Sequence, residues 1–182
     1  DSGKAIAADA KVALDDDSLF RHPEIPDMPG RDMTELERMA KEKGFNLVEL
    51  PGDIGVLANG AGLTMAALDT LQRYGGKGGT FLDLGGTDDP DRISEALGML
   101  SYNMARGRIA SILVCIFGGI TRCDTVADAL LHTITDRSVK ASMVVRLRGN
   151  NEEEAAQMLR LANFNVHVDL DEACLQAVKV RT

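Results

Sequence analysis

The strongest constraint on this chain is an alternation of short apolar segments and amphipathic segments that repeats five times from about residue 45 onward. Each apolar segment is almost continuously hydrophobic, which is typical of a strand buried on both faces of a parallel sheet. A glycine-rich or polar turn follows most of these segments, and a segment with helical spacing comes next. The expected strands are 54–57, 80–84, 111–117, 143–147 and 165–168, and the expected helices are 63–74, 90–104, 124–135, 152–162 and 171–180.

Strand–helix alternation of this length predicts βαβ units. The predicted fold class is therefore α/β, with a flavodoxin-like open parallel sheet of about five strands, helices on both faces and a short N-terminal extension. Residues 31–182 are expected to form this domain, with a further helix over 32–43. Residues 1–30 hold the acidic run Asp15–Asp17 and three prolines, a composition that disfavours helices and central strands, so we expect a linker there. Because the chain begins with Asp1, it is expected to be a piece of a longer protein.

Composition and charge argue against several classes of function. The chain has 20 Lys+Arg against 28 Asp+Glu, a formal charge of −8, and no Trp, so a nucleic-acid role is not expected. The longest apolar stretch, residues 109–117, falls well short of the roughly 20 residues that a membrane-spanning helix needs. The three cysteines form no CxxC pair, which favours free thiols in a reducing compartment over disulfides or a zinc site.

Glycine is concentrated in three of the turns, at 59–62, 85–87 and 118–121. In an open parallel sheet, ligands bind beyond the carboxyl ends of the strands. Glycine lets a ligand approach the backbone closely, and a helix start offers unpaired N–H groups and a partial positive charge. These loops therefore predict a site for phosphate or carboxylate. His22, His132 and His167 lie outside the three loops, so a reacting side chain is expected to come from another domain or chain.

Individual residues near these loops allow more than one interpretation. The spacing of Gly60, Gly62 and Asp83 is a weak match to a dinucleotide fingerprint, because Met65 stands at the third glycine position; otherwise Asp83 caps a neighbouring helix. Asp88 or Asp89 is suited to cap the helix that begins at Pro90. For Cys123, packing is preferred over a reactive thiol activated by a helix start and Arg122. Arg122 suits an anion or an interface ion pair, but a solvated side chain is the preferred interpretation.

Four motifs, in order, carry a resemblance to a known family. They are Ala58-Asn59-Gly60-Ala61-Gly62-Leu63-Thr64-Met65, Phe81-Leu82-Asp83-Leu84-Gly85-Gly86, Ile116-Phe117-Gly118-Gly119-Ile120-Thr121-Arg122-Cys123-Asp124 and Val144-Val145-Arg146-Leu147-Arg148-Gly149-Asn150-Asn151. From about Asp53 to the end, the chain resembles the C-terminal CoA-ligase domain of the succinyl-CoA synthetase (succinate–CoA ligase, NDP-forming) β subunit. Residues 8–23 resemble the tail of the ATP-grasp domain of that family.

The resemblance implies an activity that this chain would share with a partner. The family joins succinate to CoA with hydrolysis of ATP or GTP, through succinyl phosphate and a phosphohistidine on the α subunit, which also binds most of the CoA. A piece of the β subunit is expected to be inactive alone. A cytoplasmic location is expected, or the mitochondrial matrix in a eukaryote, with no nucleic acid or membrane as partner.

The same resemblance implies site residues. Asn59, Gly60, Ala61 and Gly62 would contribute a helix start to the phosphate site, and Asn59 with Gly118, Gly119, Ile120 and Thr121 would receive the carboxylate of succinate. Asp9 would ligate the Mg²⁺ of the nucleotide, in keeping with the preference of Mg²⁺ for oxygen ligands.

Two departures from the common pattern of the family leave other functions open. Thr87-Asp88 stands where a glycine and an alanine are common, and Cys115 stands where asparagine is common. These keep a malate–CoA ligase or a related acyl-CoA ligase open as alternatives. A non-catalytic nucleotide-binding or interaction module is the alternative from another class.

Overall fold

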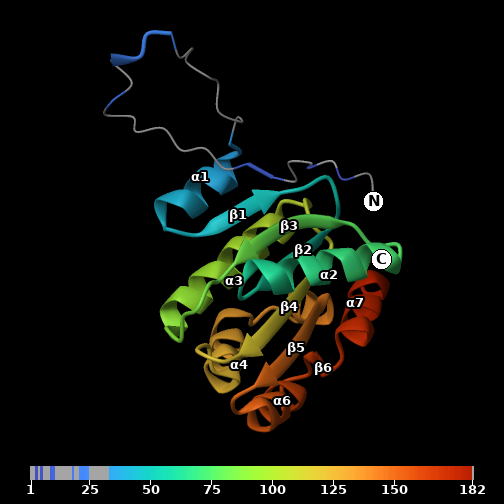
Figure 1. Cartoon of the computed structure of the whole chain (residues 1–182). Coiled ribbons are helices and arrows are strands. Elements are labelled where there is room, and N and C mark those ends of the chain that lie inside the picture. The colour runs from blue at the N-terminus through green and yellow to red at the C-terminus, as the bar shows by residue number, and fades with distance from the viewer. Residues whose placement is uncertain are drawn as a thin grey trace. The chain divides into compact units, whose positions relative to one another are not determined.

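A computed structural model of the chain describes residues 33–181, together with residues 3, 5, 9, 10, 18 and 21–24 (Figure 1). The chain divides into two compact units, residues 1–32 and 33–182. In the first unit, His22 Nδ1 lies 2.9 Å from Glu24 Oε1. The assignment of residues 1–30 to the tail of another domain stays a prediction.

The second unit is built from alternating strands and helices. Its elements are α1 (Glu35–Glu42), β1 (Asn46–Glu49), β2 (Ile54–Ala58), α2 (Ala61–Arg73), β3 (Gly78–Asp83), α3 (Pro90–Ala105), β4 (Ser111–Gly118), α4 (Cys123–Thr133), α5 (Arg137–Ala141), β5 (Met143–Gly149), α6 (Glu152–Leu161), β6 (Asn165–His167) and α7 (Leu170–Lys179). Among the residues that the structure describes, no helix is both long and apolar enough to cross a membrane.

The strands form one sheet in the order β1-β3-β2-β4-β5-β6 (Figure 1). All neighbouring strands are parallel except β1, which pairs antiparallel with β3. Without β1, this is the strand order of flavodoxin-like folds, and the predicted fold class is confirmed. The edge strand β1 and the short helix α5 were not predicted. The strand is only four residues long and mixes polar with apolar side chains, so its sequence carries a weak periodic signal.

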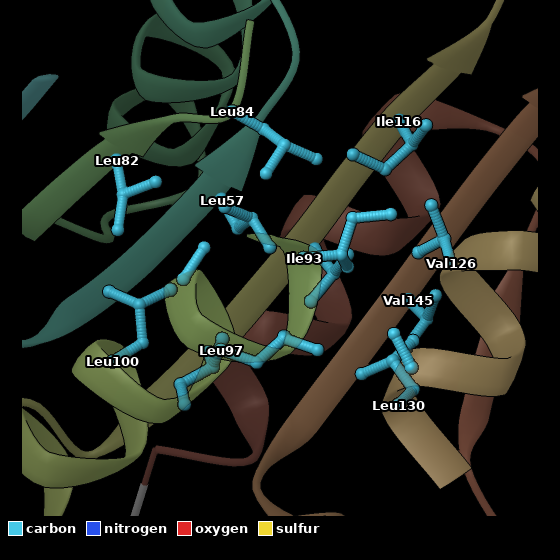
Figure 2. Packing of buried hydrophobic residues seen from close by; sticks show 14 of the residues in the cluster. Leu57, Leu82, Leu84, Ile93, Leu97, Leu100, Ile116, Val126, Leu130 and Val145 are labelled. Carbon is cyan, nitrogen blue, oxygen red and sulfur yellow. The ribbon is translucent and has the colours of Figure 1, made fainter. Parts of the chain in front are cut away.

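Helices cover both faces of the sheet, as expected. Helices α2 and α7 pack over one apolar cluster, while α1, α3, α4 and α6 pack over the other (Figure 1). Figure 2 shows part of the second cluster, where strand side chains meet side chains of α3 and α4. The residues labelled there include Leu57, Leu82, Ile93, Leu97, Ile116, Val126, Leu130 and Val145.

A capping box fixes the start of α1. The Thr34 hydroxyl accepts from Glu37 N at 3.2 Å, and Glu37 Oε2 accepts from Thr34 N at 2.9 Å. The helix therefore begins at Glu35, three residues later than the sequence pattern placed it. The second oxygen of the buried Glu37 carboxylate accepts from Glu49 N at 2.9 Å, which ties α1 to β1.

Candidate functional site

The loops after β2 and β4 lie side by side at the point where the strand order reverses. The chain leaves β2 for β3 on one side and then crosses to β4 on the other, so β2 and β4 are neighbours with their carboxyl ends at the same edge. In folds of this kind the crevice at such a switch point is the usual ligand site. The structure therefore brings together two of the three loops from which the sequence predicted anion binding.

The side chain of Asn59 fastens these two loops to each other. Its Nδ2 donates to Phe117 O at 2.9 Å, and its Oδ1 accepts from Phe117 N at 2.8 Å. Both functions of the amide are thus used by backbone groups, as if the side chain extended the ladder between β2 and β4. In this arrangement Asn59 positions the loops, and contact between its amide and a ligand would have to replace one of these bonds.

The start of α2 is open and offers unpaired amides. Gly60 has φ +104°, and its N–H donates to Asp83 Oδ1 at 2.7 Å. Within the described residues, the amides of Ala61, Gly62 and Leu63 make no hydrogen bond, since the first intrahelical bond runs from Thr64 N to Gly60 O. A Cβ at Gly60 or Gly62 would meet nothing within 4 Å. These three amides can receive an anion.

The loop after β4 is braced from the next strand. Asn150 donates from its backbone N to Gly118 O at 2.9 Å and from its side chain to Gly119 O at 3.1 Å. The amides of Ile120 and Thr121 have no hydrogen-bond partner in the described part of the chain, and neither does the buried Thr121 hydroxyl. Thr121 is fully buried, so the amide of Ile120, a residue that is 74% exposed, is the one of these two donors that a carboxylate can reach.

Two carboxylates, one at the end of β3 and one in the β3–α3 connection, each accept a hydrogen bond from an amide of these loops. Asp83 Oδ1 accepts from Gly60 N and also from Gly85 N, at 2.7 and 2.9 Å. Asp88 Oδ1 accepts from Arg122 N at 2.8 Å. The dinucleotide interpretation needs Asp83 for a ribose, yet this carboxylate is bound to backbone of its own chain. The helix-capping interpretation of Asp83 fits the structure better.

Arg122 is held in an ion pair at the start of α4. Its Nε and one terminal nitrogen donate to the two carboxylate oxygens of Asp124, and Asn151 Nδ2 also donates to this carboxylate at 2.9 Å. Hydrogen bonds from Arg122 and then Asn151 lower the pKa of Asp124 well below its usual range. The guanidinium of Arg122 is therefore already paired with a carboxylate in the first turn of the same helix.

The three cysteines are buried, and none of them has an activated thiol. Burial is the main cause that raises the pKa of Cys115 and of Cys123 to about 11, and that of Cys174 to about 12. For Cys123 the charges of Glu152 and Asp124 raise the pKa further. The interpretation of Cys123 as a thiol with a lowered pKa is therefore wrong, because burial outweighs the helix start.

We expect Cys115, Cys123 and Cys174 to resist alkylation in the native protein. A thiol with a pKa of about 11 or 12 is almost fully protonated at neutral pH, and the thiolate is the species that reacts. Peptide mapping after brief treatment with iodoacetamide at pH 7.5 should find these positions unmodified, and all three modified after denaturation. Rapid native modification of Cys123 would contradict this assignment.

Asp9, the predicted Mg²⁺ ligand, lies in the first unit. Its Oδ1 accepts from Ala10 N at 2.7 Å. Among the described residues, no group of three or more histidine, cysteine, aspartate or glutamate side chains is arranged to hold a metal ion. Since most neighbours of Asp9 in the sequence lie outside the described residues, its role stays a prediction.

Two braces of the site were not predicted as parts of it. Asp88 or Asp89 was predicted to cap α3, and Asp89 fills that role by accepting from Asp91 N at 3.0 Å. Asn150 was noted only within a motif. In the sequence, two signals pointed to Asp88: a second acidic residue beside a helix start that needs a single cap, and the departure of Thr87-Asp88 from the common pattern of the family.

Comparisons with known proteins place the chain in a family. Residues 57–180 match the family model described as CoA-ligase. The chain is 44% identical to the succinate–CoA ligase [ADP-forming] subunit beta of Desulfurococcus amylolyticus and 42% identical to that of Staphylothermus marinus, with 98% of this chain and 46% of each relative covered. The chain thus spans about half the length of these curated relatives.

The fold also recurs in solved structures. A structure of ATP citrate lyase from Methanothrix soehngenii, in complex with citrate and coenzyme A, superposes with a TM-score of 0.69 over 91% of this chain and 52% of that chain. At 17% identity this likeness shows the shared fold. The family match covers most of the described domain and confirms the resemblance expected from the four motifs. The chain belongs to the CoA-ligase family.

Proposed function

We propose that the chain is the C-terminal region of the β subunit of a nucleotide-dependent acid–CoA ligase. The complete enzyme would convert succinate or a similar acid, CoA and ATP or GTP to the acyl-CoA, the nucleoside diphosphate and phosphate. The observation that carries this proposal is the pair of neighbouring loops with unpaired amides at the switch point. Similarity to succinate–CoA ligase β subunits over nearly the whole chain supports it.

In this proposal the chain binds charge and leaves the covalent chemistry to its partner. The amides of Ala61, Gly62 and Leu63 would hold a phosphoryl group carried on a histidine of an α subunit. Donors that are fixed before the reaction stabilise such charge without reorganisation, and the helix dipole adds to them. No histidine lies in either loop, which agrees with a phosphorylated residue supplied in trans.

The second loop would orient the acid. The amide of Ile120 would bind its carboxylate, and the tie between Asn59 and Phe117 would keep this loop at a fixed distance from the phosphate site. Reaction between a carboxylate and a phosphoryl group depends on such positioning. Mg²⁺ and the nucleotide would bind in the region that contains Asp9 and in the part of the protein that precedes it, and CoA mainly on the α subunit.

An assay of the complete β chain mixed with its α partner tests this function. Thioester formation should require an acid, CoA, Mg²⁺ and ATP or GTP, with succinate and malate as the first acids to compare. The α subunit should become phosphorylated on histidine when the nucleotide is added without CoA. Absence of thioester formation with every C4 dicarboxylic acid would contradict the proposal.

A further inference from the structure

Asn59 and Gly60 form the one Asn-Gly step in the sequence, a step at which an asparagine can modify itself. In an unfolded chain, the backbone nitrogen of the glycine attacks the side-chain carbonyl carbon, Cγ, of the asparagine. Glycine favours this attack because it has no side chain to hinder the approach and adopts many backbone conformations. Asparagine is accordingly counted among the thermolabile residues of proteins. The candidate site therefore contains a dipeptide that is prone to deamidation.

The reaction needs no reagent except water. Gly60 N loses its proton and forms a bond to Asn59 Cγ, while the bond between Cγ and Nδ2 breaks and ammonia leaves. Water then opens the resulting succinimide ring at either of its two carbonyl carbons, which gives aspartate or isoaspartate at position 59. The product carries a carboxylate in place of the amide, and nothing is oxidised or reduced.

The fold holds the two reacting groups apart. The Gly60 N–H donates to Asp83 Oδ1 at 2.7 Å, so it is directed toward the end of β3. The side-chain amide of Asn59 is fixed through both of its polar atoms to the backbone of Phe117 in β4. Because β3 and β4 flank β2 on opposite sides, the nitrogen and the carbon are held toward different neighbours. Ring closure therefore requires at least one of these ties to open first.

Asp83 also opposes the reaction through its charge. The nitrogen of Gly60 attacks after it has lost its proton, and a carboxylate that accepts from this N–H disfavours a second negative charge there. The same oxygen of Asp83 accepts from Gly85 N at 2.9 Å, which fixes the carboxylate in place. Asp83 is half-buried, so water screens this charge only in part.

A carboxylate at position 59 would undo the tie between the two loops. It cannot donate a hydrogen bond to Phe117 O, and it would face that carbonyl oxygen with a negative charge. Position 59 is also two residues before Ala61, the first of the three amides that are proposed to hold the phosphoryl group. The new charge would repel this group.

We propose that Asn59-Gly60 is a self-modification site that Asp83 and the tie to Phe117 keep closed in the folded protein, and that its deamidation inactivates the enzyme. The chemical part of the proposal depends on the fold alone, whereas the loss of activity rests on the proposed function.

The test incubates the complete αβ enzyme in warm, mildly alkaline buffer and follows position 59 by peptide mapping, with the two products separated by chromatography and identified by mass. In the native wild type Asn59 should stay unmodified. In urea it should convert faster than the six other asparagines of this sequence. Asp83→Ala should raise the rate of conversion in the folded enzyme about ten- to a hundredfold, the factor expected for loss of a hydrogen bond to a charged group.

Two further variants separate this role of Asp83 from a general loosening of the loops. Asp88→Ala is the matched control, because it removes a carboxylate that accepts from Arg122 N at the same edge and leaves Gly60 N bonded. It should change conversion at position 59 by less than about twofold. Asp83→Asn keeps an oxygen acceptor for Gly60 N without the charge and should give an intermediate rate. It keeps the test decisive if thermal unfolding shows that Asp83→Ala is not folded.

Activity is measured on the same samples. The fraction of activity lost should follow the fraction of Asn59 converted. Asn59→Asp reproduces the aspartate product and should lower kcat/KM for the acid by about tenfold or more, because both a hydrogen bond and a favourable field for the anion are lost.

Each part of the proposal can fail separately. Conversion of Asn59 in urea no faster than that of the other asparagines would overturn the site itself. Equal rates in the wild type and in folded Asp83 variants would overturn the protective role of Asp83. Full activity of Asn59→Asp in an active enzyme would overturn the inactivation. If the wild type is inactive toward every acid, the proposed function fails, and the peptide maps still decide the chemistry.

Discussion

Replacing Ala61 with proline is expected to lower the turnover of the complete ligase by about 10²- to 10³-fold while the domain stays folded. Ala61 is the first residue of α2, and its N–H is one of the three amides without a partner in the described chain. Proline suits the first position of a helix, where the amide is free in any case. Gly60 has ψ 140°, which is the extended range that a residue before proline prefers.

The result should appear in kcat and in the rate of histidine phosphorylation, measured by quench-flow on the αβ complex, with the thermal midpoint near that of the wild type. Ala61→Ser keeps the amide and should keep most of the rate. Proline at Gly60 is a poorer probe, because φ there is +104° and the N–H already bonds Asp83. Normal phosphorylation in a well-folded Ala61→Pro enzyme would exclude the amide of Ala61 from the phosphate site.

The framework of this fold could be predicted because its signals are local. Nearly continuous apolar segments identified the five parallel strands, and all five are present. Glycine at the turns and the cap of α3 placed the helices to within a few residues. What failed depends on pairing between distant segments: β1 is a strand because the edge of β3 accepts it, and its own four residues do not indicate this.

The candidate site shows the same division. The glycine loops could be found in the sequence, and the rule for parallel sheets placed them at one edge. The side chains that fasten these loops could not be found, because each joins segments far apart in the sequence: Asn59 reaches across 58 residues and Asp88 across 34. A polar residue near a turn carries no sign of which remote amide it will meet. This is why the sequence could offer Asp88 or Asp89 as the cap of α3 but could not indicate that Asp88 bonds Arg122 N.

Gly149 is the last residue of β5 and pairs with Gly118, the last residue of β4. Its replacement by alanine is expected to lower the free energy of unfolding more than any other substitution predicted for this chain. The residue has φ +116°, which L side chains rarely adopt. A Cβ there would lie 2.3 Å from Gly118 O and 2.7 Å from Gly118 C, both backbone atoms that cannot rotate away. Backbone strain and overpacking together should destabilise the folded state by roughly 3 kcal/mol or more.

Gly107→Ala is the matched control, because Gly107 also has positive φ, +70°, but a Cβ there meets nothing within 4 Å. It carries the conformational cost alone, about 1–2 kcal/mol. Urea unfolding of the complete chain should separate the free energies of unfolding of the two variants. At a temperature where Gly149→Ala is still folded, this variant should also raise the KM for the acid, because Gly118 must move to make room. Equal loss of stability in both variants would mean that the backbone of β5 shifts to accommodate the new methyl group. The loop after β4 would then not be held in place by contact with Gly149.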